Sequence, residues 1–269
     1  MRAYAEFAGF YDQIMGDRSA DVARVRSYIT RFCPAARTLL ELGCGTGAML
    51  AGLTRGLEVT GVDRSPEMLA VAATAVPAAR LVEADMSAFS LGTRFDVVIC
   101  VFDTLNHLPT FADWREMFDR AHEHLADGGL FVFDVNTTQR LRRLWQGPAF
   151  ASDFGEHSMI MDVQPAIAAA ADSRAAAHGS DEPGTSGNSE RGGELSLWTV
   201  KIFERIEGDV FRLHEERIPE LGVPLASIRE ALEPHFELLD ATGLDGEPAT
   251  DDSSRAFFAC RNRGASGTA

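Results

Sequence analysis

The stretch that decides the fold is Leu39-Leu-Glu-Leu-Gly-Cys-Gly-Thr-Gly47, in which an apolar segment passes through an acidic residue and ends in three glycines at alternate positions. Helix-forming residues follow at once, from Ala48 to Leu53. Glycine lets the backbone turn sharply and lets a ligand come close to the main chain. At the carboxyl end of a parallel strand, such a turn builds a ligand crevice. The run therefore predicts a strand, a ligand-binding turn and a helix.

Asp63 supplies the second half of this signal. It directly follows the next predicted strand, 58–62, and a carboxylate in that place can accept hydrogen bonds from both hydroxyls of a ribose. The glycine spacing is G-x-G-x-G, which differs from the G-x-G-x-x-G fingerprint of dinucleotide-binding proteins. The ligand expected here is a nucleoside that brings no phosphate to the turn.

Composition narrows the class of protein. The chain has 269 residues, of which 45% are hydrophobic, so it can hold one large or two small domains with an ample core. No run approaches the roughly 20 apolar residues of a membrane span, and the first residues lack a signal-peptide pattern. We therefore expect a soluble cytoplasmic protein. The net charge of −15 disfavours a nucleic-acid partner. The four cysteines form no C-x-x-C pair, so neither zinc nor redox chemistry is indicated.

Strands and helices alternate through the first half of the chain. The apolar patterns predict strands at 38–42, 58–62, 79–83, 95–101 and 130–135, and helices at 20–32, 48–55, 66–75 and 111–125. An earlier helix is predicted over 2–15. Such alternation is typical of a parallel sheet covered on both faces.

The pattern changes after residue 150. Partial alternation predicts strands at 159–163, 197–206 and 210–218, which would form an antiparallel insertion. A helix at 224–232 and strands at 236–241 and 255–260 then return to the first pattern. Within the insertion, residues 165–194 are dominated by Ala, Ser and Gly and are predicted to be a disordered loop, the alternative being a functional lid. The basic cluster Arg140, Arg142 and Arg143 is interpreted as a solvated surface group.

These motifs resemble the class I S-adenosylmethionine (SAM) methyltransferases, whose first motif has the form Glu/Asp-x-Gly-x-Gly-x-Gly. The resemblance implies a Rossmann-like, doubly wound α/β fold. Its mostly parallel seven-stranded sheet would carry helices on both faces and an antiparallel β insertion between the fifth strand and the last helix. The implied organisation is N-terminal capping helices (1–36), a SAM-binding core (37–147 and 219–263), an insertion over the acceptor site (148–218) and a flexible tail (264–269).

The resemblance also implies a donor site. Asp63 would bind the ribose, Asp85 would accept from the adenine amino group, and Phe102 would pack near the adenosine. The full set of implied SAM-binding residues is Tyr11, Glu41, Gly43, Cys44, Gly45, Gly47, Asp63, Arg64, Met68, Asp85, Met86 and Phe102. Two of them have structural alternatives: Asp85 as a turn or helix-capping carboxylate, and Cys44 as a small residue that fits a tight turn.

The run from Phe95 to Leu108 is similar to the corresponding run in the branch that N-methylates amino sugars. His107 matches a histidine beside the acceptor amine there, and is predicted as a catalytic base. Tyr11 is predicted at the mouth of the site with a catalytic role, while Asp103 and Asn106 are predicted to fix the acceptor or the donor's amino-acid tail. The alternatives are that His107 caps the next helix, Asn106 holds the loop turn and Tyr11 is a half-buried core residue.

The function that follows is methyl transfer from SAM to nitrogen or oxygen of a small-molecule acceptor by in-line displacement. S-adenosylhomocysteine (SAH) would be the product, and no metal is expected because the sequence has no H-x-x-x-H pair or clustered Asp set. A non-catalytic SAM-binding sensor or scaffold remains the alternative. An NAD-dependent oxidoreductase is disfavoured by the glycine spacing. The acceptor, and the choice between a monomer and a homodimer, stay open.

Overall fold

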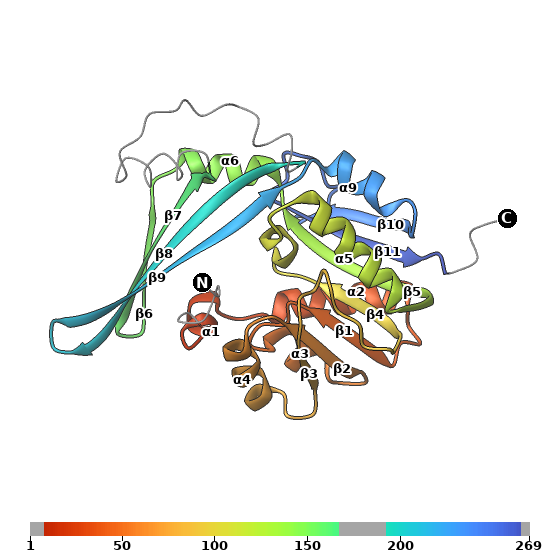
Figure 1. The fold of residues 1–269 in the computed structure, drawn as a ribbon, viewed down its shortest axis with the longest axis horizontal. Helices are drawn as coiled ribbons and strands as arrows, with labels where there is room; N and C mark the ends of the chain where they lie inside the picture. The colour runs from red at the N-terminus through yellow and green to blue at the C-terminus, as the bar shows by residue number, and fades with distance from the viewer. Residues whose placement is uncertain (1–7, 167–191, 265–269) are drawn as a thin grey trace.

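The computed structural model describes residues 8–166 and 192–264, which fold into two sheets (Figure 1). The larger sheet has seven strands in the order β10-β11-β5-β4-β1-β2-β3, and the smaller has four in the order β6-β7-β8-β9. In the larger sheet β3, β2, β1, β4 and β5 run parallel, whereas β11 is antiparallel to both β5 and β10. The predicted Rossmann-like fold with an antiparallel insertion is confirmed.

The core strands and helices lie close to their predicted positions. The strands of the larger sheet are β1 (Thr38–Leu42), β2 (Glu58–Asp63), β3 (Arg80–Glu83), β4 (Phe95–Cys100), β5 (Leu125–Asn136), β10 (Phe236–Gly243) and β11 (Arg255–Asn262). The helices are α1 (Tyr11–Met15), α2 (Ser19–Phe32), α3 (Ala48–Leu53), α4 (Pro66–Ala75), the 3-10 turn η1 (Thr104–His107), α5 (Phe111–Glu123), α6 (Thr138–Gln146) and α9 (Leu225–Leu232).

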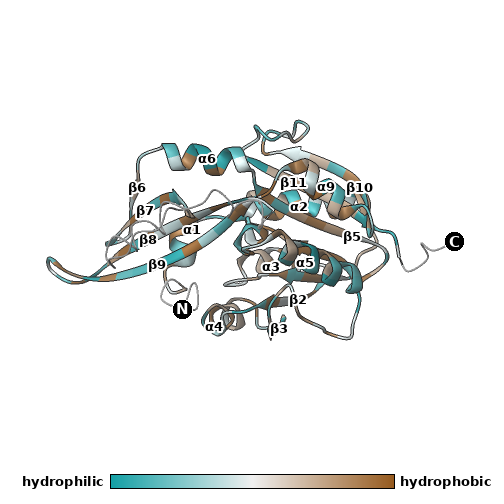
Figure 2. Cartoon of the chain, turned by 45° about the horizontal axis from the view of Figure 1, so that its top comes forward, coloured by the Kyte–Doolittle hydropathy of each residue, from teal (hydrophilic) through white to brown (hydrophobic). Residues whose placement is uncertain are grey.

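Alternate residues of the core strands face opposite sides of the sheet, and each side is covered by helices. Leu39, Val97 and Ile99 pack with residues of α2 and α3, whereas their neighbours Leu40 and Val98 pack with α5 and α9. Because both faces are covered, the strands read as continuous apolar runs. Figure 2 shows this hydrophobic colouring along β5, while the β8–β9 hairpin mixes polar and apolar residues.

Local sequence explains where two helices begin. Ser65 caps α4 by accepting from the Met68 backbone N–H at 3.2 Å, and Pro66 takes the first helical position. Thr110 caps α5 in a reciprocal capping box with Asp113. Both helices lead away from the carboxyl edge of the sheet, so their caps fix the loops that follow β2 and η1.

The structure differs from the sequence predictions at two element boundaries and in one additional helix. β5 begins at Leu125 and passes through Gly128-Gly129, because a register shift between Phe95 and Val97 of β4 absorbs the two glycines within the strand pair. The basic cluster Arg140, Arg142 and Arg143 lies in helix α6, which was not predicted from the sequence. In the predicted N-terminal helix over 2–15, the described residues are helical only over Tyr11–Met15, and residues 1–7 lie outside the described part.

The antiparallel sheet consists of β6 (Phe150–Phe154), β7 (His157–Pro165), β8 (Glu194–Glu207) and β9 (Val210–Gly222). We call it the arm, because the β8–β9 hairpin extends well beyond the core (Figure 1). β9 runs past the predicted end at 218 and delivers Pro219 and Glu220 to the core. Of the loop predicted as disordered, Pro165 and Glu194 are strand residues, and 167–191 lie outside the described residues.

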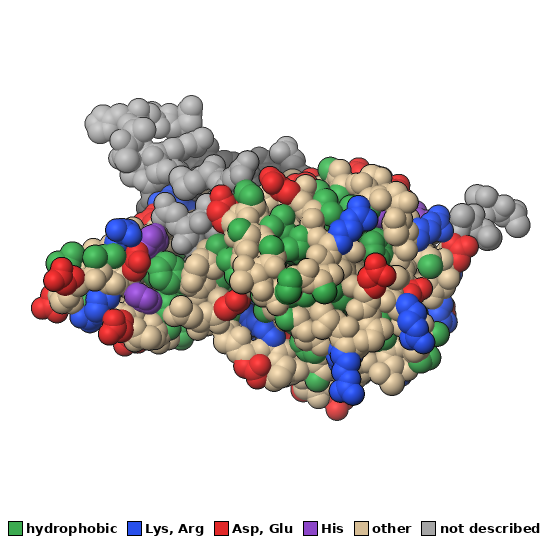
Figure 3. All heavy atoms as spheres, turned by 90° about the horizontal axis from the view of Figure 1, so that it is seen from below, with side chains coloured by type: hydrophobic (Ala, Val, Ile, Leu, Met, Phe, Trp, Pro, Cys, Tyr) green, Lys and Arg blue, Asp and Glu red, His purple; other side chains and the backbone are tan. Residues whose placement is uncertain are grey.

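Two surface findings bear on possible partners. Among the helices of the described ranges, none combines the length and the apolar character needed to cross a membrane. On the face shown in Figure 3, basic side chains are interspersed with acidic ones and form no continuous basic surface.

Candidate active site

The candidate site lies where the strand order of the sheet reverses. β1 has β2 on one side and β4 on the other, so the loops that leave β1 and β4 diverge at the carboxyl edge. In open α/β sheets such a divergence creates the ligand crevice. The loop after β1 holds the three glycines, and the loop after β4 holds Phe102 and Asp103.

The glycine turn has the backbone that its residues predict. Gly43, Gly45 and Gly47 have φ angles of 68°, 51° and 78°, in the left-handed region that glycine tolerates best. The carboxylate of Asp63 ties this turn to the start of α4. It accepts from the Gly45 backbone N–H at 2.8 Å and from the Ser65 backbone N–H at 2.9 Å. Asp63 therefore shapes the turn as well as facing the crevice.

The crevice opens into a pocket of about 720 Å³, part of which is open to solvent. Ten of the predicted site residues line it: Tyr11, Gly43, Gly45, Asp63, Arg64, Met68, Asp85, Met86, Phe102 and His107. A Cβ added to Gly45 would meet no protein atom within 4 Å, so the main chain there borders open space. A long pocket with carboxylates at Asp63 and Asp85 and with bare backbone at Gly45 fits a cationic nucleoside such as SAM.

Three residues predicted to bind the donor do not line the pocket. Glu41 is 3% exposed, its Oε2 has no hydrogen-bond partner, and burial raises its pKa well above the ordinary value. Cys44 packs beneath Gly61, where an added Cβ would come within 2.6 Å of its Sγ, and burial raises the pKa of its thiol. Gly47 caps α3 against Ala72. In the structure these residues support the turn from behind, and their predicted contact with the donor stays a prediction.

Asp85 fixes a turn, as one of its two sequence interpretations predicted, and its position in the pocket lining is compatible with the other. Its side chain lines the pocket, and its Oδ1 also accepts from the Ser87 backbone N–H at 2.8 Å and from the Ser87 hydroxyl at 2.6 Å. Met86 lies beside it in the pocket wall. The turn after β3 is thus fixed by Asp85, and the carboxylate remains at the pocket surface.

The N-terminal segment closes one side of the pocket. Tyr11 lines it, and burial, together with the Asp103 carboxylate, raises the pKa of the Tyr11 hydroxyl. The next residue, Asp12, accepts from the hydroxyl of Thr46 in the glycine turn at 2.6 Å. This bond connects α1 directly to the loop after β1.

The loop after β4 has a strained backbone. Phe102 and Asp103 have φ angles of 70° and 48°, in a region that residues with side chains rarely adopt. Asp134 of β5 holds them by accepting from the two backbone N–H groups at 2.6 and 3.2 Å. Arg255 of β11 adds an ion pair to Asp103 and another to Asp134 at 3.3 Å. Strain of this kind persists only where surrounding contacts hold it.

His107 stands at the pocket wall beside the arm. Its Nδ1 lies 3.4 Å from the carbonyl oxygen of Pro219 in β9. A carbonyl oxygen can only accept, so Nδ1 donates in this contact and the neutral ring carries its lone pair on Nε2. Burial lowers the pKa of His107, which keeps the imidazole neutral near pH 7. A neutral imidazole with a lone pair on Nε2 has the form that a general base requires.

The predicted acceptor contact of Asn106 is not supported. Asn106 is fully buried, its amide donates to the carbonyl oxygens of Asn136 and Leu221 at 3.0 and 2.9 Å, and its Oδ1 accepts from the Asn136 backbone N–H at 3.0 Å. These bonds join η1 to β5 and β9, which leaves no side-chain group for a ligand. The alternative, that Asn106 holds the loop, is the one observed.

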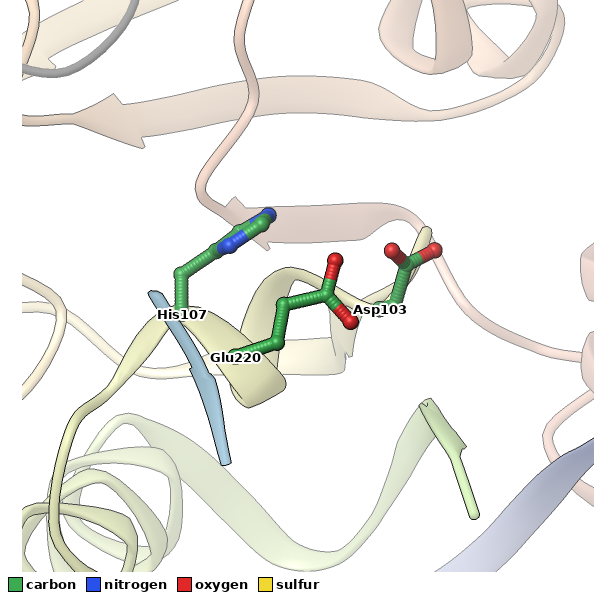
Figure 4. A group of neighbouring side chains, drawn as sticks. All are labelled: Asp103, His107 and Glu220. Carbon is green, nitrogen blue, oxygen red and sulfur yellow. The ribbon is translucent and has the colours of Figure 1, made fainter. Parts of the chain in front are cut away.

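Glu220 was not predicted, and it lies next to two of the predicted residues, Asp103 and His107. Ligand atoms of Asp103, His107 and Glu220 lie within 4.8 Å of one another (Figure 4). Glu220 is 3% exposed, and its Oε2 accepts from Asn136 Nδ2 at 3.0 Å. One signal could have found it: Glu216, Ile218 and Glu220 are all buried on one face of β9, and carboxylates at inward positions of a strand are unusual.

Comparison with known proteins agrees with this geometry. Residues 39–129 match the family model described as a methyltransferase domain. The chain is 32% identical over 170 residues to a putative methyltransferase of a Geobacillus strain, an alignment that covers 60% of this chain and 69% of that protein. The chain belongs to the class I SAM-dependent methyltransferases, and it is a methyl-transferring enzyme.

Other relatives carry more specific names. A dTDP-3-amino-3,6-dideoxy-α-D-glucopyranose N,N-dimethyltransferase from Streptomyces fradiae is 34% identical over 134 residues, which cover 48% of this chain and 52% of that protein. A SAM-dependent methyltransferase from Clostridium acetobutylicum superimposes with a TM-score of 0.77 at 21% identity, covering 97% and 99% of the two chains. A SAM-bound amino pentose methyltransferase from Micromonospora echinaspora superimposes with a TM-score of 0.66 at 20% identity, covering 97% and 98%. Both superpositions extend over nearly the full length of each chain, which shows a common fold.

Proposed function

We propose that this enzyme transfers the methyl group of SAM to an amine on a small-molecule acceptor. The observation that carries the proposal is the environment of His107. It lines the donor pocket as a neutral imidazole, and the carboxylates of Asp103 and Glu220 lie beside it. Two carboxylates next to a base favour an acceptor that arrives with a positive charge, as an amine does near neutral pH. The N,N-dimethyltransferase relatives of the chain support the same choice.

We assign the donor side to the loops after β1, β2 and β3. Asp63 would hold the ribose hydroxyls, Asp85 and Met68 the adenine, and Gly43 and Gly45 the backbone approach. Bound there, SAM supplies an activated methyl group on a sulfonium, so the protein need not build an electrophile. Arg64, Met86 and Phe102 complete the wall. The sequence prediction that no metal takes part stays a prediction.

The residues of the acceptor side have two tasks. The first is to place the nucleophile in line with the methyl carbon, since placement alone can supply a large share of the rate. Tyr11 and His107 line the pocket and are the side chains assigned to the acceptor side, with His107 held by the carbonyl oxygen of Pro219 in the arm. The second is to take a proton from the acceptor ammonium, because only the neutral amine has a lone pair for attack. His107 Nε2 is the group assigned to that step.

The test is a screen with donor labelled in the methyl group. The panel would hold dTDP-3-amino-sugars, simple primary and secondary amines, matched hydroxyl sugars, phenols and carboxylic acids including trans-aconitate, the acceptor named in another relative. We expect label only in members that carry an amine. Gly45→Val, whose side chain would fill the donor space, is the control and should transfer no label. Transfer confined to phenols or carboxylates would contradict the proposal.

A further inference from the structure

Glu220 stands out as a buried carboxylate with an incomplete set of partners. Its Oε2 accepts from Asn136 Nδ2, but within residues 8–166 and 192–264 its Oε1 has neither a hydrogen bond nor an ion pair. Although the residue as a whole is only 3% exposed, Oε1 itself can be reached by solvent, so this oxygen is open to a ligand. Figure 4 shows this carboxylate pointing into the space between His107 and Asp103.

The charges around Glu220 are unbalanced. Asp103 and Asp134 are acidic neighbours, and Arg255 is already shared between them through its two ion pairs. The charge of Arg140 in α6 lowers the pKa of Glu220 slightly, but the two side chains are too far apart to form an ion pair. Burial and the Asp103 carboxylate raise the pKa of Glu220 well above its ordinary value, and burial raises the pKa of Asp134 to about 6, so the cluster lacks a cation on the side that faces His107. A group that brings positive charge to this place would be stabilised there.

We propose that Glu220 is a positioning residue of the methyl-transfer reaction, stabilising positive charge on the acceptor amine and then on His107. The inference rests on the proposed function and deepens it. In the step concerned, one N–H proton of the acceptor ammonium passes to His107 Nε2. The freed nitrogen lone pair forms the N–C bond to the methyl carbon as the C–S bond breaks, and sulfur keeps that electron pair. The imidazolium left behind has the Glu220 and Asp103 carboxylates beside it.

The proposal also assigns a role to the arm. Asp103 and His107 come from the loop after β4, which belongs to the donor-binding core, whereas Glu220 comes from β9. β9 pairs with β8 through Ser196 opposite Glu220 and Leu197 opposite Pro219, so the arm sheet fixes where the carboxylate stands. The amine site is thus completed by a residue outside the core motifs.

The test needs no knowledge of the acceptor. Sinefungin carries a protonated amine where SAM carries its methyl sulfonium, whereas SAH is neutral at that place. Calorimetry of both ligands should be carried out on the wild type and on Glu220→Gln, which keeps an oxygen for Asn136. Glu220→Asp serves as the conservative variant. Glu215→Gln, an exposed position on the same strand, serves as the matched control.

We expect Glu220→Gln to weaken sinefungin binding on the order of tenfold, the effect of losing one unit charge at this range. SAH affinity should stay within about twofold of the wild-type value, Glu220→Asp should recover part of the loss, and Glu215→Gln should match the wild type. Equal affinity of both ligands for wild type and Glu220→Gln would overturn the proposal. Equal loss of both ligands would overturn it too, because that result marks a structural residue.

Two further outcomes are decisive. If the wild type binds Mn²⁺ by calorimetry and Glu220→Gln does not, the cluster is a metal site and the ammonium assignment is wrong. If the acceptor screen finds no amine substrate but the sinefungin preference depends on Glu220, the charge role stands and the proposed acceptor class fails. The two claims are therefore separable.

Discussion

Arg255, in the last strand of the core, is ion-paired with Asp103, which lies in the loop after β4 and 152 residues earlier in the chain. The same guanidinium reaches Asp134 at 3.3 Å. All three side chains are at most 16% exposed. One cation thus pairs both with Asp134, which fixes the strained backbone of Phe102 and Asp103, and with the side chain of Asp103 itself. The conformation of the loop after β4 therefore depends on a contact with β11, the last strand of the core.

Replacing Arg255 should therefore be costly. We predict that Arg255→Met lowers the free energy of unfolding by about 3–5 kcal/mol, because two buried carboxylates lose their cation. Combining it with Asp103→Asn should cost less than the sum of the two single changes. Urea unfolding of the four proteins measures this. The control is Arg261→Met, which lies on the same strand as Arg255 and removes an exposed ion pair with Glu237 of β10. It should change the free energy of unfolding by at most about 1 kcal/mol. Strict additivity would contradict the account.

Asp63 should contribute both to the affinity for the donor and to the stability of the glycine turn. Two variants separate these contributions. Asp63→Asn keeps one oxygen for the Gly45 N–H, whereas Asp63→Ala removes both acceptors. Each lost charge-assisted hydrogen bond to the ribose is worth roughly 1.5–3 kcal/mol, so both variants should bind SAH much more weakly. Only the alanine variant should also lose thermal stability. Unchanged SAH affinity in a folded Asp63→Ala protein, measured by calorimetry, would remove Asp63 from the donor site.

Gly43 is required for a different reason from Gly45. A Cβ added to Gly43 would lie 2.2 Å from Thr104 Cγ2, in addition to the strain of a φ of 68°. We predict that Gly43→Ala is destabilised well beyond the 1–2 kcal/mol of a left-handed alanine. Thr104→Ser, which deletes that methyl group, should restore part of the loss. Gly128→Ala is the control, since its φ is 74° but no atom lies within 4 Å of the new Cβ. If Gly43→Ala and Gly128→Ala lower the free energy of unfolding equally, the expected clash with Thr104 does not occur.

The pH dependence of His107 has a definite sign. Burial lowers its pKa in the folded protein, so the imidazole stays neutral, and able to act as a base, below pH 6.5. The unfolded chain binds the proton more readily, so this residue lowers stability as the pH falls below about 6.5. Activity should persist through that range and fall only at lower pH.

His107→Gln should reduce turnover by about 10²–10⁴-fold at neutral pH while SAH affinity stays near normal. Higher pH should restore part of its rate, because more of the acceptor amine is then neutral. Initial rates across pH, measured with the amine acceptor from the screen, provide the test. A loss confined to KM with no response to pH would show that His107 only positions the acceptor.

The donor half of the site could be predicted because its signals are local. Residues 39–47 hold a strand, its turn and a helix start in one run, and Asp63 follows the next strand in the same way. The acceptor half could not, because it is assembled over distance. Glu220 and Arg255 reach Asp103 from β9 and β11, and no spacing in the sequence relates them. The loop-holding role of Asn106 could not be chosen from the sequence, because its partners Asn136 and Leu221 are equally remote.

Boundaries were missed for similar reasons. The sequence Gly128-Gly129 suggests that the strand is interrupted, but β4 pairs with β5 on both sides of the two glycines, at Leu125 and at Leu130. The arm was predicted as antiparallel from its alternation, yet its contribution to the site lies in the last residues of β9, beyond the predicted end of the strand. Tertiary pairing extended both strands past the point where the local pattern stops.

The central claim is that the methyl group of SAM reaches an amine nitrogen. The most direct measurement uses SAM with a ¹³C-labelled methyl group, incubated with the enzyme and an amino-sugar acceptor that also carries free hydroxyls, and followed by ¹³C NMR. We expect a new resonance in the N-methyl region with a three-bond correlation to the proton on the carbon that bears the amine; it should be absent with Gly45→Val and should form much more slowly with His107→Gln. A resonance in the O-methyl region, or none with any amine, would contradict the claim.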